Sequence, residues 1–382
     1  SGQQVKSPNG ENYPFPFAGG MNACQFGEVD INRDGIMDLL VFDRQGDRLM
    51  PFINEGTPGV INYTYAPEYI EEFPDFSHWV MFRDYNMDGR MDIFAYNPAF
   101  PGIIVYRNKS NENLRFELEV FPYLTSWYGS GYVNILVTYA DYPGIEDIDG
   151  DGDLDILTFG ALGSFVEMHK NLSVETYGHA DSLIFELATR CWGEFAESEE
   201  SNKLFLDTCF GGKYYFPEEL SGRDRHTGST LLLADLNNNG NKDLLLGDVD
   251  YPQLIYLHNG GTPEDAYIGL YTQDFPDPGN PSWIYSMPAA ALIDVNNDGI
   301  KDFLVSPFDP SPFVTQNLNS VYLYEGSNEM PAWTLRTRSF LQQSMLDVGS
   351  GAYPVFADIN LDGLHDLIIG NYGYYRESWY DE

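Results

Sequence analysis

Six copies of one short acidic motif recur along the 382-residue chain and constrain its fold more than any other feature. Each copy spans nine residues, with oxygen-bearing side chains at positions 1, 3, 5 and 9 and glycine at position 6. Glycine permits a sharp turn there, because the backbone shape that the turn demands is strained for other residues. The six copies begin at Asp30, Asp84, Asp147, Asp235, Asp294 and Asp358.

This spacing of oxygens predicts a calcium site in every copy. Ca²⁺ takes roughly six to eight oxygen ligands at about 2.3–2.6 Å. We expect the side chains at positions 1, 3 and 5 to curl around the ion, while the carbonyl of position 7 and the carboxylate of position 9 close the shell. One copy alone is equally compatible with an acidic turn, since Asp, Asn and Gly dominate turns, but six copies in one context are not. The predicted ligands of up to six Ca²⁺ ions are Asp30, Asn32, Asp34, Ile36, Asp38, Asp84, Asn86, Asp88, Arg90, Asp92, Asp147, Asp149, Asp151, Asp153, Asp155, Asp235, Asn237, Asn239, Asn241, Asp243, Asp294, Asn296, Asp298, Ile300, Asp302, Asp358, Asn360, Asp362, Leu364 and Asp366.

The copies differ in charge, and more ligand charge generally raises calcium affinity. The copy at Asp147 has four ligand aspartates with Asp153 nearby, so we expect it to bind most tightly. In the copy at Asp235 only two of the predicted ligands, Asp235 and Asp243, are charged, so we expect the weakest binding there.

The residues that follow the motif exclude an EF-hand, which needs a bidentate Glu at position 12 and helices on both sides. Short apolar runs flank the copies instead, such as Leu39–Val41 after the first and Leu232–Leu233 before the fourth. Such runs bounded by turn signals indicate buried strands, so each motif is predicted to connect the two strands of a β-hairpin. Position 12 carries Val41, Ala95, Thr158, Leu246, Val305 and Ile369.

A second marker, an asparagine 24 residues after the first aspartate, extends the repeat in four units. In the fifth unit the segment Tyr322–Ser327 takes its place, displaced by an insertion around Pro307–Asn319. A fixed offset indicates a second hairpin in register with the first, and strand-rich repeats of ~40–50 residues are typical of propeller blades. The fold predicted is all-β: a β-propeller of about four-stranded blades in a ring of six or seven. The four asparagines are Asn54, Asn108, Asn171 and Asn259.

A ring of repeats makes residues 1–382 a single β-propeller domain, although this length alone favours two or three domains. The units begin near residues 20, 75, 133, 226, 285 and 350, and residues 176–225 are predicted to be an insertion. The 24-residue offset from the sixth aspartate reaches Glu382, so we expect the last blade to be incomplete in this chain. Tyr13–Phe17 contains two prolines and is a poor strand donor. Our hypothesis is that a continuation of the chain or a partner completes that blade.

Between Phe26 and Gly370 the chain resembles FG-GAP/VCBS-type β-propellers, whose blades carry Asp-x-Asp-x-Asp-Gly-x-x-Asp loops like those of integrin α-subunit heads. The Gly-Ala-Pro half of the FG-GAP signature is absent, so an integrin-like ligand face is not expected. The aromatic, Asn-rich blades also resemble surface proteins exported by type IX secretion, although the sorting domain with which these usually end is not visible. The resemblance implies a calcium-binding, cell-surface adhesion protein.

The charge balance, with 58 acidic against 20 basic residues and a net charge of −38, excludes several partners. Nucleic-acid binding rests on Lys and Arg neutralising phosphates, and anionic membranes repel an acidic surface for the same reason. No apolar run approaches the ~18–20 residues of a membrane span. Calcium loops of extracellular modules bind at roughly 10⁻⁴–10⁻³ M, so we expect an extracellular or cell-surface location, associated with the outer membrane.

Two cysteines lie in the longest interval between motifs. Cys191 and Cys209 are predicted to form a disulfide that staples this insertion, the alternative being two unpaired buried thiols. Cys24 precedes the first motif on a predicted strand and is expected to be a core residue.

The sequence offers little catalytic chemistry, because the paired carboxylates are committed to the loops and no Ser-His-Asp order, HExxH or CxxC pattern is present. The one basic cluster, Arg223–His226, could clamp an anion, but we favour an ion-paired loop, as expected in an acidic protein. We predict that the protein is not an enzyme; a polysaccharide lyase-like activity is the remaining enzymatic alternative.

Clusters of aromatic residues with glycine, in Tyr123–Tyr132 and Tyr372–Tyr375, could form platforms for sugars or proteins. Packing between blades is the alternative, since most large aromatic side chains are buried. The predicted function is therefore a calcium-stabilised scaffold for a protein or glycan partner. A subunit of an outer-membrane or secretion assembly, bound to an outer-membrane protein, is the second hypothesis.

Overall fold

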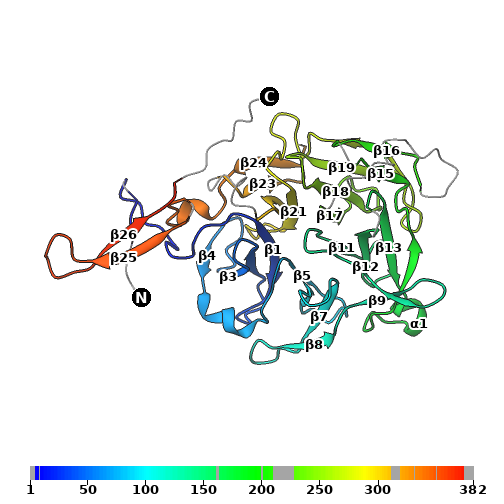
Figure 1. The fold of residues 1–382 in the computed structure, drawn as a ribbon, viewed down its shortest axis with the longest axis horizontal. Helices are drawn as coiled ribbons and strands as arrows, with labels where there is room; N and C mark the ends of the chain where they lie inside the picture. Colours follow the sequence, from blue (N-terminus) through cyan, green and yellow to red (C-terminus); the bar gives the residue numbers. More distant parts are fainter. Residues whose placement is uncertain are drawn as a thin grey trace.

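The protein is an all-β structure whose sheets form blades around a central axis (Figure 1). First strands of neighbouring blades contact one another, which places them nearest that axis. The computed structural model describes residues 5–7, 9–160, 163–198, 201–209, 228–310, 319–330, 332–349 and 351–373.

Each blade is an antiparallel meander in which four consecutive strands pair in chain order. The blades are β1 (Cys24–Val29), β2 (Asp38–Asp43), β3 (Arg48–Asn54) and β4 (Tyr63–Tyr65); β5 (Val80–Arg83), β6 (Asp92–Tyr96), β7 (Ile103–Asn108) and β8 (Phe116–Val120); β11 (Gly144–Glu146), β12 (Asp155–Phe159), β13 (Val166–Asn171) and β14 (Phe185–Thr189); β17 (Ser229–Ala234), β18 (Asp243–Asp248), β19 (Leu254–Asn259) and β20 (Ile268–Thr272); and β21 (Pro288–Ile293), β22 (Asp302–Pro307), β23 (Tyr322–Gly326) and β24 (Trp333–Thr337).

The second strands explain the continuous apolar runs that follow the motifs. Strands β2, β6, β18 and β22 are buried at every residue. Both faces of these strands pack on neighbouring blades, so apolar residues are required at successive positions rather than at alternate ones. The fourth strands lie at the rim, and β8 accordingly has no buried residue.

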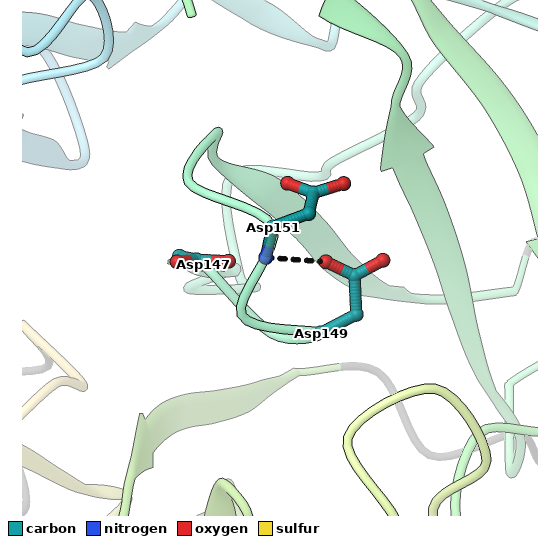
Figure 2. A group of neighbouring side chains, drawn as sticks. All are labelled: Asp147, Asp149 and Asp151. Carbon is teal, nitrogen blue, oxygen red and sulfur yellow. Dashed lines mark hydrogen bonds between the residues drawn. The ribbon is translucent and has the colours of Figure 1, made fainter. Parts of the chain in front are cut away.

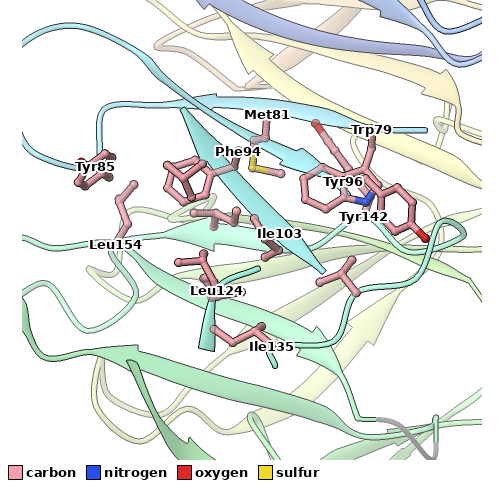
Figure 3. Packing of buried hydrophobic residues seen from close by; sticks show 14 of the residues in the cluster. Trp79, Met81, Tyr85, Phe94, Tyr96, Ile103, Leu124, Ile135, Tyr142 and Leu154 are labelled. Carbon is pink, nitrogen blue, oxygen red and sulfur yellow. The ribbon is translucent and has the colours of Figure 1, made fainter. Parts of the chain in front are cut away.

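Five hydrophobic cores hold the ring together, one between each pair of adjacent blades. The core between the second and third blades combines Trp79 and Phe94 with Ile145 and Ile156. Figure 3 labels Trp79, Phe94 and Leu154 of this core. The five cores together enclose the axis, so every blade is covered on both faces.

The fifth core closes the ring, because it joins the first blade to the last. Leu39 and Val41 of β2 pack there with Ile293 and Leu304 of the fifth blade. Across the same seam the side chains of Asn54 and Asn297 exchange hydrogen bonds of 2.9 and 3.0 Å, and the Cys24 amide donates to Ser306 Oγ at 2.9 Å. Cys24 is a buried free thiol, as expected.

The prediction of six or seven blades is therefore wrong: the described residues form five blades of about four strands. The first and fifth blades pack directly on each other, which leaves no place in the ring for a sixth. The sixth motif lies instead in a hairpin of β25 (Tyr353–Ala357) and β26 (Asp366–Gly370), which forms a separate two-stranded sheet beside the ring (Figure 1).

In the described part of the chain, residues 5–7 and 9–20 do not pair with that hairpin. Phe15 and Ala18 are buried in the seam between the first and fifth blades. The Phe15 amide donates to the carbonyl of Ser344, at the end of a 3₁₀ turn that spans Gln342–Ser344. The proline-containing segment thus contributes side chains to the core rather than a strand to a sheet.

Several elements are added to the five blades. A hairpin of β9 (Thr125–Trp127) and β10 (Tyr132–Asn134) extends the third sheet, with β9 parallel to β14. A 3₁₀ turn spans Pro67–Glu72 and helix α1 spans Ser173–Tyr177. Among the described residues, no helix is long and apolar enough to cross a membrane.

The predicted disulfide between Cys191 and Cys209 is present. It brackets a hairpin of β15 (Phe195–Glu197) and β16 (Leu204–Leu206), which lies against the fourth blade, since the Ile268 amide of β20 donates to the carbonyl of Gly193. Two sites of interest from the sequence lie outside the described residues: the basic cluster Arg223–His226 and Glu382, at which the marker of the last blade was expected.

Candidate metal centres

The six acidic motifs occupy equivalent positions, each joining the first and second strands of its unit. Because the five blades repeat around the axis, five of the loops lie at the same end of the ring. The sixth loop joins β25 to β26 in the separate hairpin. The structure thus places every predicted ligand in a strand-connecting loop or at its boundary.

Hydrogen bonds within the loop turn the side chains of positions 1, 3 and 5 inward. In the first loop the Asp34 amide donates to Asp30 Oδ1 at 3.1 Å and to Asn32 Oδ1 at 3.0 Å. The Gly35 amide donates to Asp30 Oδ2, and the Ile36 amide to Asp34 Oδ1. The same set recurs in the loops that begin at Asp84, Asp235, Asp294 and Asp358.

The backbone of the loop is left-handed at positions 4 and 6. Glycine fills position 6, with φ 86° at Gly35, but position 4 accepts side chains, with φ 65° at Arg33 and 60° at Leu361. A left-handed backbone conformation at a residue other than glycine is strained, so it persists only where surrounding interactions hold it in place. The inward hydrogen bonds supply that constraint in every copy.

In the five loops of the ring, the aspartate at position 9 is buried and links the loop to the third strand. Asp38 is 0% exposed; its Oδ2 accepts the Ile31 amide at 2.8 Å and its Oδ1 accepts the Asn54 amide at 2.8 Å. The equivalent bond to the second marker is made in the next three units, and in the fifth unit Gly326 donates instead. This bond explains the fixed 24-residue offset in the sequence.

The asparagine marker completes the link through its side chain. Asn54 Nδ2 donates to the Met37 carbonyl at 3.0 Å, and its Oδ1 accepts the Gly56 amide. Asn108 makes the same pair of bonds with Met91 and Ser110. The marker therefore fastens the loop end of the second strand to the turn after the third strand.

Burial raises the pKa of the carboxyl at position 9, despite the backbone hydrogen bonds that lower it. The pKa is raised to about 6 at Asp38 and Asp302, to about 7 at Asp92 and to about 8 at Asp155. A nearby cation favours the ionised form of a carboxyl. These buried carboxyls are therefore suited to a cation in the loop.

The third loop concentrates the most charge. Oxygens of Asp147, Asp149 and Asp151 lie within 4.8 Å of one another, around the turn that Figure 2 shows. Lys170 of β13 forms a salt bridge with Asp149, and its Nζ lies 3.3 Å from Asp151 Oδ2. This acidic cluster has the oxygen donor set of a divalent-cation site.

The fourth loop is held by amide groups instead. Asn237 Nδ2 donates to Asp243 Oδ2 at 2.7 Å, and Asn239 Nδ2 donates to the Asn259 carbonyl at 3.1 Å. The hydroxyl of Tyr256 also donates to Asp243 Oδ2. Donors that satisfy the carboxylate in this way reduce its need for a cation. The weaker calcium binding expected of this loop stays a prediction.

The model of the FG-GAP-like repeat family matches residues 30–95, which run from the first loop to β6. That segment contains two of the loops and the marker between them, and the remaining units repeat its geometry around the ring. The chain is an FG-GAP β-propeller. The Gly-Ala-Pro half of the family signature remains absent from its sequence.

Integrin α subunits are similar to part of this FG-GAP β-propeller. Mouse integrin α7 is 26% identical over 170 residues, which cover 41% of this chain and 13% of the integrin. Integrin α3 of Cricetulus griseus is 26% identical over 167 residues, which cover 37% of this chain and 14% of the integrin. The similarity thus spans about one seventh of the length of these relatives.

Two solved structures align with the FG-GAP β-propeller at 15% identity. One is an Agrocybe aegerita lectin described as recognising non-reducing terminal N-acetylglucosamine, with a TM-score of 0.35 over 92% of this chain and 75% of the lectin. The other is a putative glucose dehydrogenase from Thermus thermophilus, with a TM-score of 0.30 over 77% of this chain and 93% of that chain. TM-scores this low carry no weight for fold or function.

Two charged residues approach the third loop from outside the motif and were not predicted from the sequence. Lys170 and Glu175 lie beside its aspartates, and Lys170 Nζ is 2.6 Å from Glu175 Oε1. Lys170 directly precedes the marker Asn171, and Arg107 and His258 hold the same place in other units. A basic residue directly before the marker was therefore the sequence signal that could have identified Lys170 in this FG-GAP β-propeller.

Proposed function

We propose that this FG-GAP β-propeller is a calcium-stabilised scaffold that binds a protein or a glycan outside the cytoplasm, at the cell surface. The observation that carries the proposal is the loop geometry: one set of inward-turned oxygens recurs in four of the five loops at one end of the closed ring and again in the loop between β25 and β26. The extracellular location follows from the modest calcium affinity of such loops, which requires a calcium-rich medium.

Calcium has a structural role in this proposal. In each loop the oxygens of positions 1, 3, 5 and 9, with the position 7 carbonyl, hold the ion. A bound Ca²⁺ supplies positive charge that offsets the repulsion among the loop carboxylates. In the ring, the position 9 carboxylate and its bond to the third strand then transmit the loop's rigidity to the whole blade.

The ligand platform that we favour is the hairpin β9–β10. Its Trp127 and Tyr132 are 38% and 63% exposed, and their rings lie 5.3 Å apart. Exposed aromatic rings of this kind anchor sugars and protein partners, since they bury a large area at low entropic cost. Only the third sheet carries such an added hairpin among the described blades.

The platform is tested with a glycan array probed by the full chain and by the double variant Trp127→Ala/Tyr132→Ala. We expect the variant to lose at least about fivefold in affinity, since loss of an interface anchor costs more than about 1 kcal/mol. Trp283→Ala is the matched control, because Trp283 is 46% exposed but lies outside the hairpin. Equal binding by all three proteins would contradict the platform.

A second candidate function, membership of an outer-membrane or secretion assembly, is favoured by the hairpin β25–β26. Its side chains are apolar yet exposed, including Val355 at 57%, Phe356 at 66% and Leu361 at 86%. Such patches characterise protein interfaces. Affinity purification from native membranes tests this role: the partner should be lost with Val355→Ser/Phe356→Ser and retained with the double variant of the β9–β10 platform.

The absence of enzymatic activity remains a prediction. The position 9 carboxyls are engaged by backbone amides, and Lys170 is engaged by three carboxylates. These groups therefore have structural roles, as partners in hydrogen bonds and salt bridges. Turnover of an acidic polysaccharide that disappeared in Arg223→Ala would refute the prediction.

A further inference from the structure

The third loop has a second group of carboxylates beside the one that the motif supplies. Oxygens of Asp151, Asp153 and Glu175 also lie within 4.8 Å of one another. Asp151 belongs to both groups, whereas Glu175 comes from α1, after the third strand. Ligands on opposite sides of a calcium ion are about 4.8 Å apart when each bond is about 2.4 Å, so the spacing suits this ion.

An unpartnered buried oxygen in this group points to a ligand. Asp153 is 0% exposed. Its Oδ2 accepts the Val174 amide at 2.8 Å, but within the described part of the chain its buried Oδ1 accepts no hydrogen bond. A buried carboxylate oxygen left without a donor is costly. A cation between Asp153 and its two neighbours would remove that cost.

The charge balance supports the same conclusion. The loop has five aspartates and α1 adds Glu175, whereas Lys170 is the one cation among the described residues that forms salt bridges with this group, contacting Asp149, Asp151 and Glu175. A single Ca²⁺ with Lys170 leaves this group of carboxylates negative. A second divalent cation fits, and Ca²⁺ suits irregular oxygen sets better than Mg²⁺, which demands near-octahedral geometry.

We propose that the third loop binds two calcium ions, the second held by Asp151, Asp153 and Glu175, with Asp151 bridging both. The site depends on α1, which follows the marker in this unit and brings Glu175 to the loop. The inference rests on the proposed calcium binding of the first site, because the two ions share a ligand.

Native mass spectrometry of the full chain during calcium titration tests the proposal by counting ions. Glu175→Gln should bind one Ca²⁺ fewer than the wild-type chain at saturation. Glu186→Gln is the matched control, since Glu186 lies on β14 of the same blade and belongs to neither carboxylate group; it should retain the wild-type count. Equal melting temperatures of wild type and Glu175→Gln in EDTA would show that the variant folds.

Anomalous diffraction from crystals grown with calcium provides the second readout. We expect two peaks in the third loop, about 4 Å apart as in other two-metal sites, and one peak in Glu175→Gln. An unchanged ion count in Glu175→Gln together with a single wild-type peak would overturn the inference while leaving the proposed function intact. Failure of every loop to bind calcium would instead overturn both.

Discussion

At the scale of single residues, the buried aspartate at position 9 and the asparagine marker define four of the five blades. Their spacing could be recognised in the sequence because it is invariant in four units. The reason for this spacing could not be predicted from the sequence. Only the folded structure shows that the backbone amide of the marker donates to a carboxylate 16 residues earlier, as Asn108 does to Asp92. Lys170 and Glu175 were missed for the same reason, because they reach the loop only through tertiary folding.

The marker side chain should contribute measurably to stability. Replacing Asn108 with alanine leaves the Met91 carbonyl and the Ser110 amide without their partner. Loss of a buried hydrogen-bonding group costs about 1–3 kcal/mol, so we expect a decrease of that size in the free energy of unfolding. Urea denaturation in saturating calcium measures it. Asn111→Ala, on the exposed turn that follows, should change stability by less than about 0.5 kcal/mol.

His169 predicts a pH dependence of stability. Burial, assisted by Arg190, lowers the pKa of this imidazole from 6.5 to about 4. The unfolded chain binds the proton more readily, so the stability from neutral His169 is present above pH 6.5 and is lost as the pH falls toward 4. Between pH 7.5 and pH 5 we expect a loss of about 2 kcal/mol from this residue.

Urea denaturation of the wild-type chain and of His169→Gln at both pH values isolates the contribution of His169. The variant cannot be protonated at this position, so its stability should fall by about 2 kcal/mol less. If both proteins lose the same stability, the imidazole does not control the acid sensitivity.

At the scale of elements, hairpins and their order were predictable, because apolar runs and Gly-containing turns recur at each motif. The added hairpin β9–β10 was not, since its strands are three residues each and belong to no repeat. The apolar pattern of β25 and β26 matched that of the ring hairpins, yet these strands remain exposed. A local apolar pattern indicates which side chains of a strand can be buried. Whether they are buried depends on the elements that pack against the strand.

The hairpin β25–β26 should open more readily than the ring. Within the described residues its five residue pairs join β25 to β26 alone, and β25 is exposed over most of its length. Segments with few buried contacts open at low free energy. Hydrogen–deuterium exchange should label Val355 within the fastest class, long before Leu40 in β2. Protection of β25 equal to that of β2 in the isolated chain would contradict this.

At the scale of the whole molecule, the sequence predicted a propeller but not its closure. Counting motifs predicts six units, whereas the ring closes after five because Leu39 and Val41 of the first blade pack on Ile293 and Leu304 of the fifth. These partners are more than 250 residues apart in the sequence. Such long-range packing leaves no periodic signal, so a repeat count cannot fix the number of blades.

The central claim is that calcium held in the loops stabilises the ring. The most direct test compares the melting temperature of the full chain in millimolar calcium with that in excess EDTA. Ions that bind only the folded state stabilise it by mass action, by about 2.7 kcal/mol per site at one hundred times the dissociation constant. We predict a markedly lower melting temperature in EDTA, restored when calcium is added back. An identical melting temperature in the two conditions would contradict the claim.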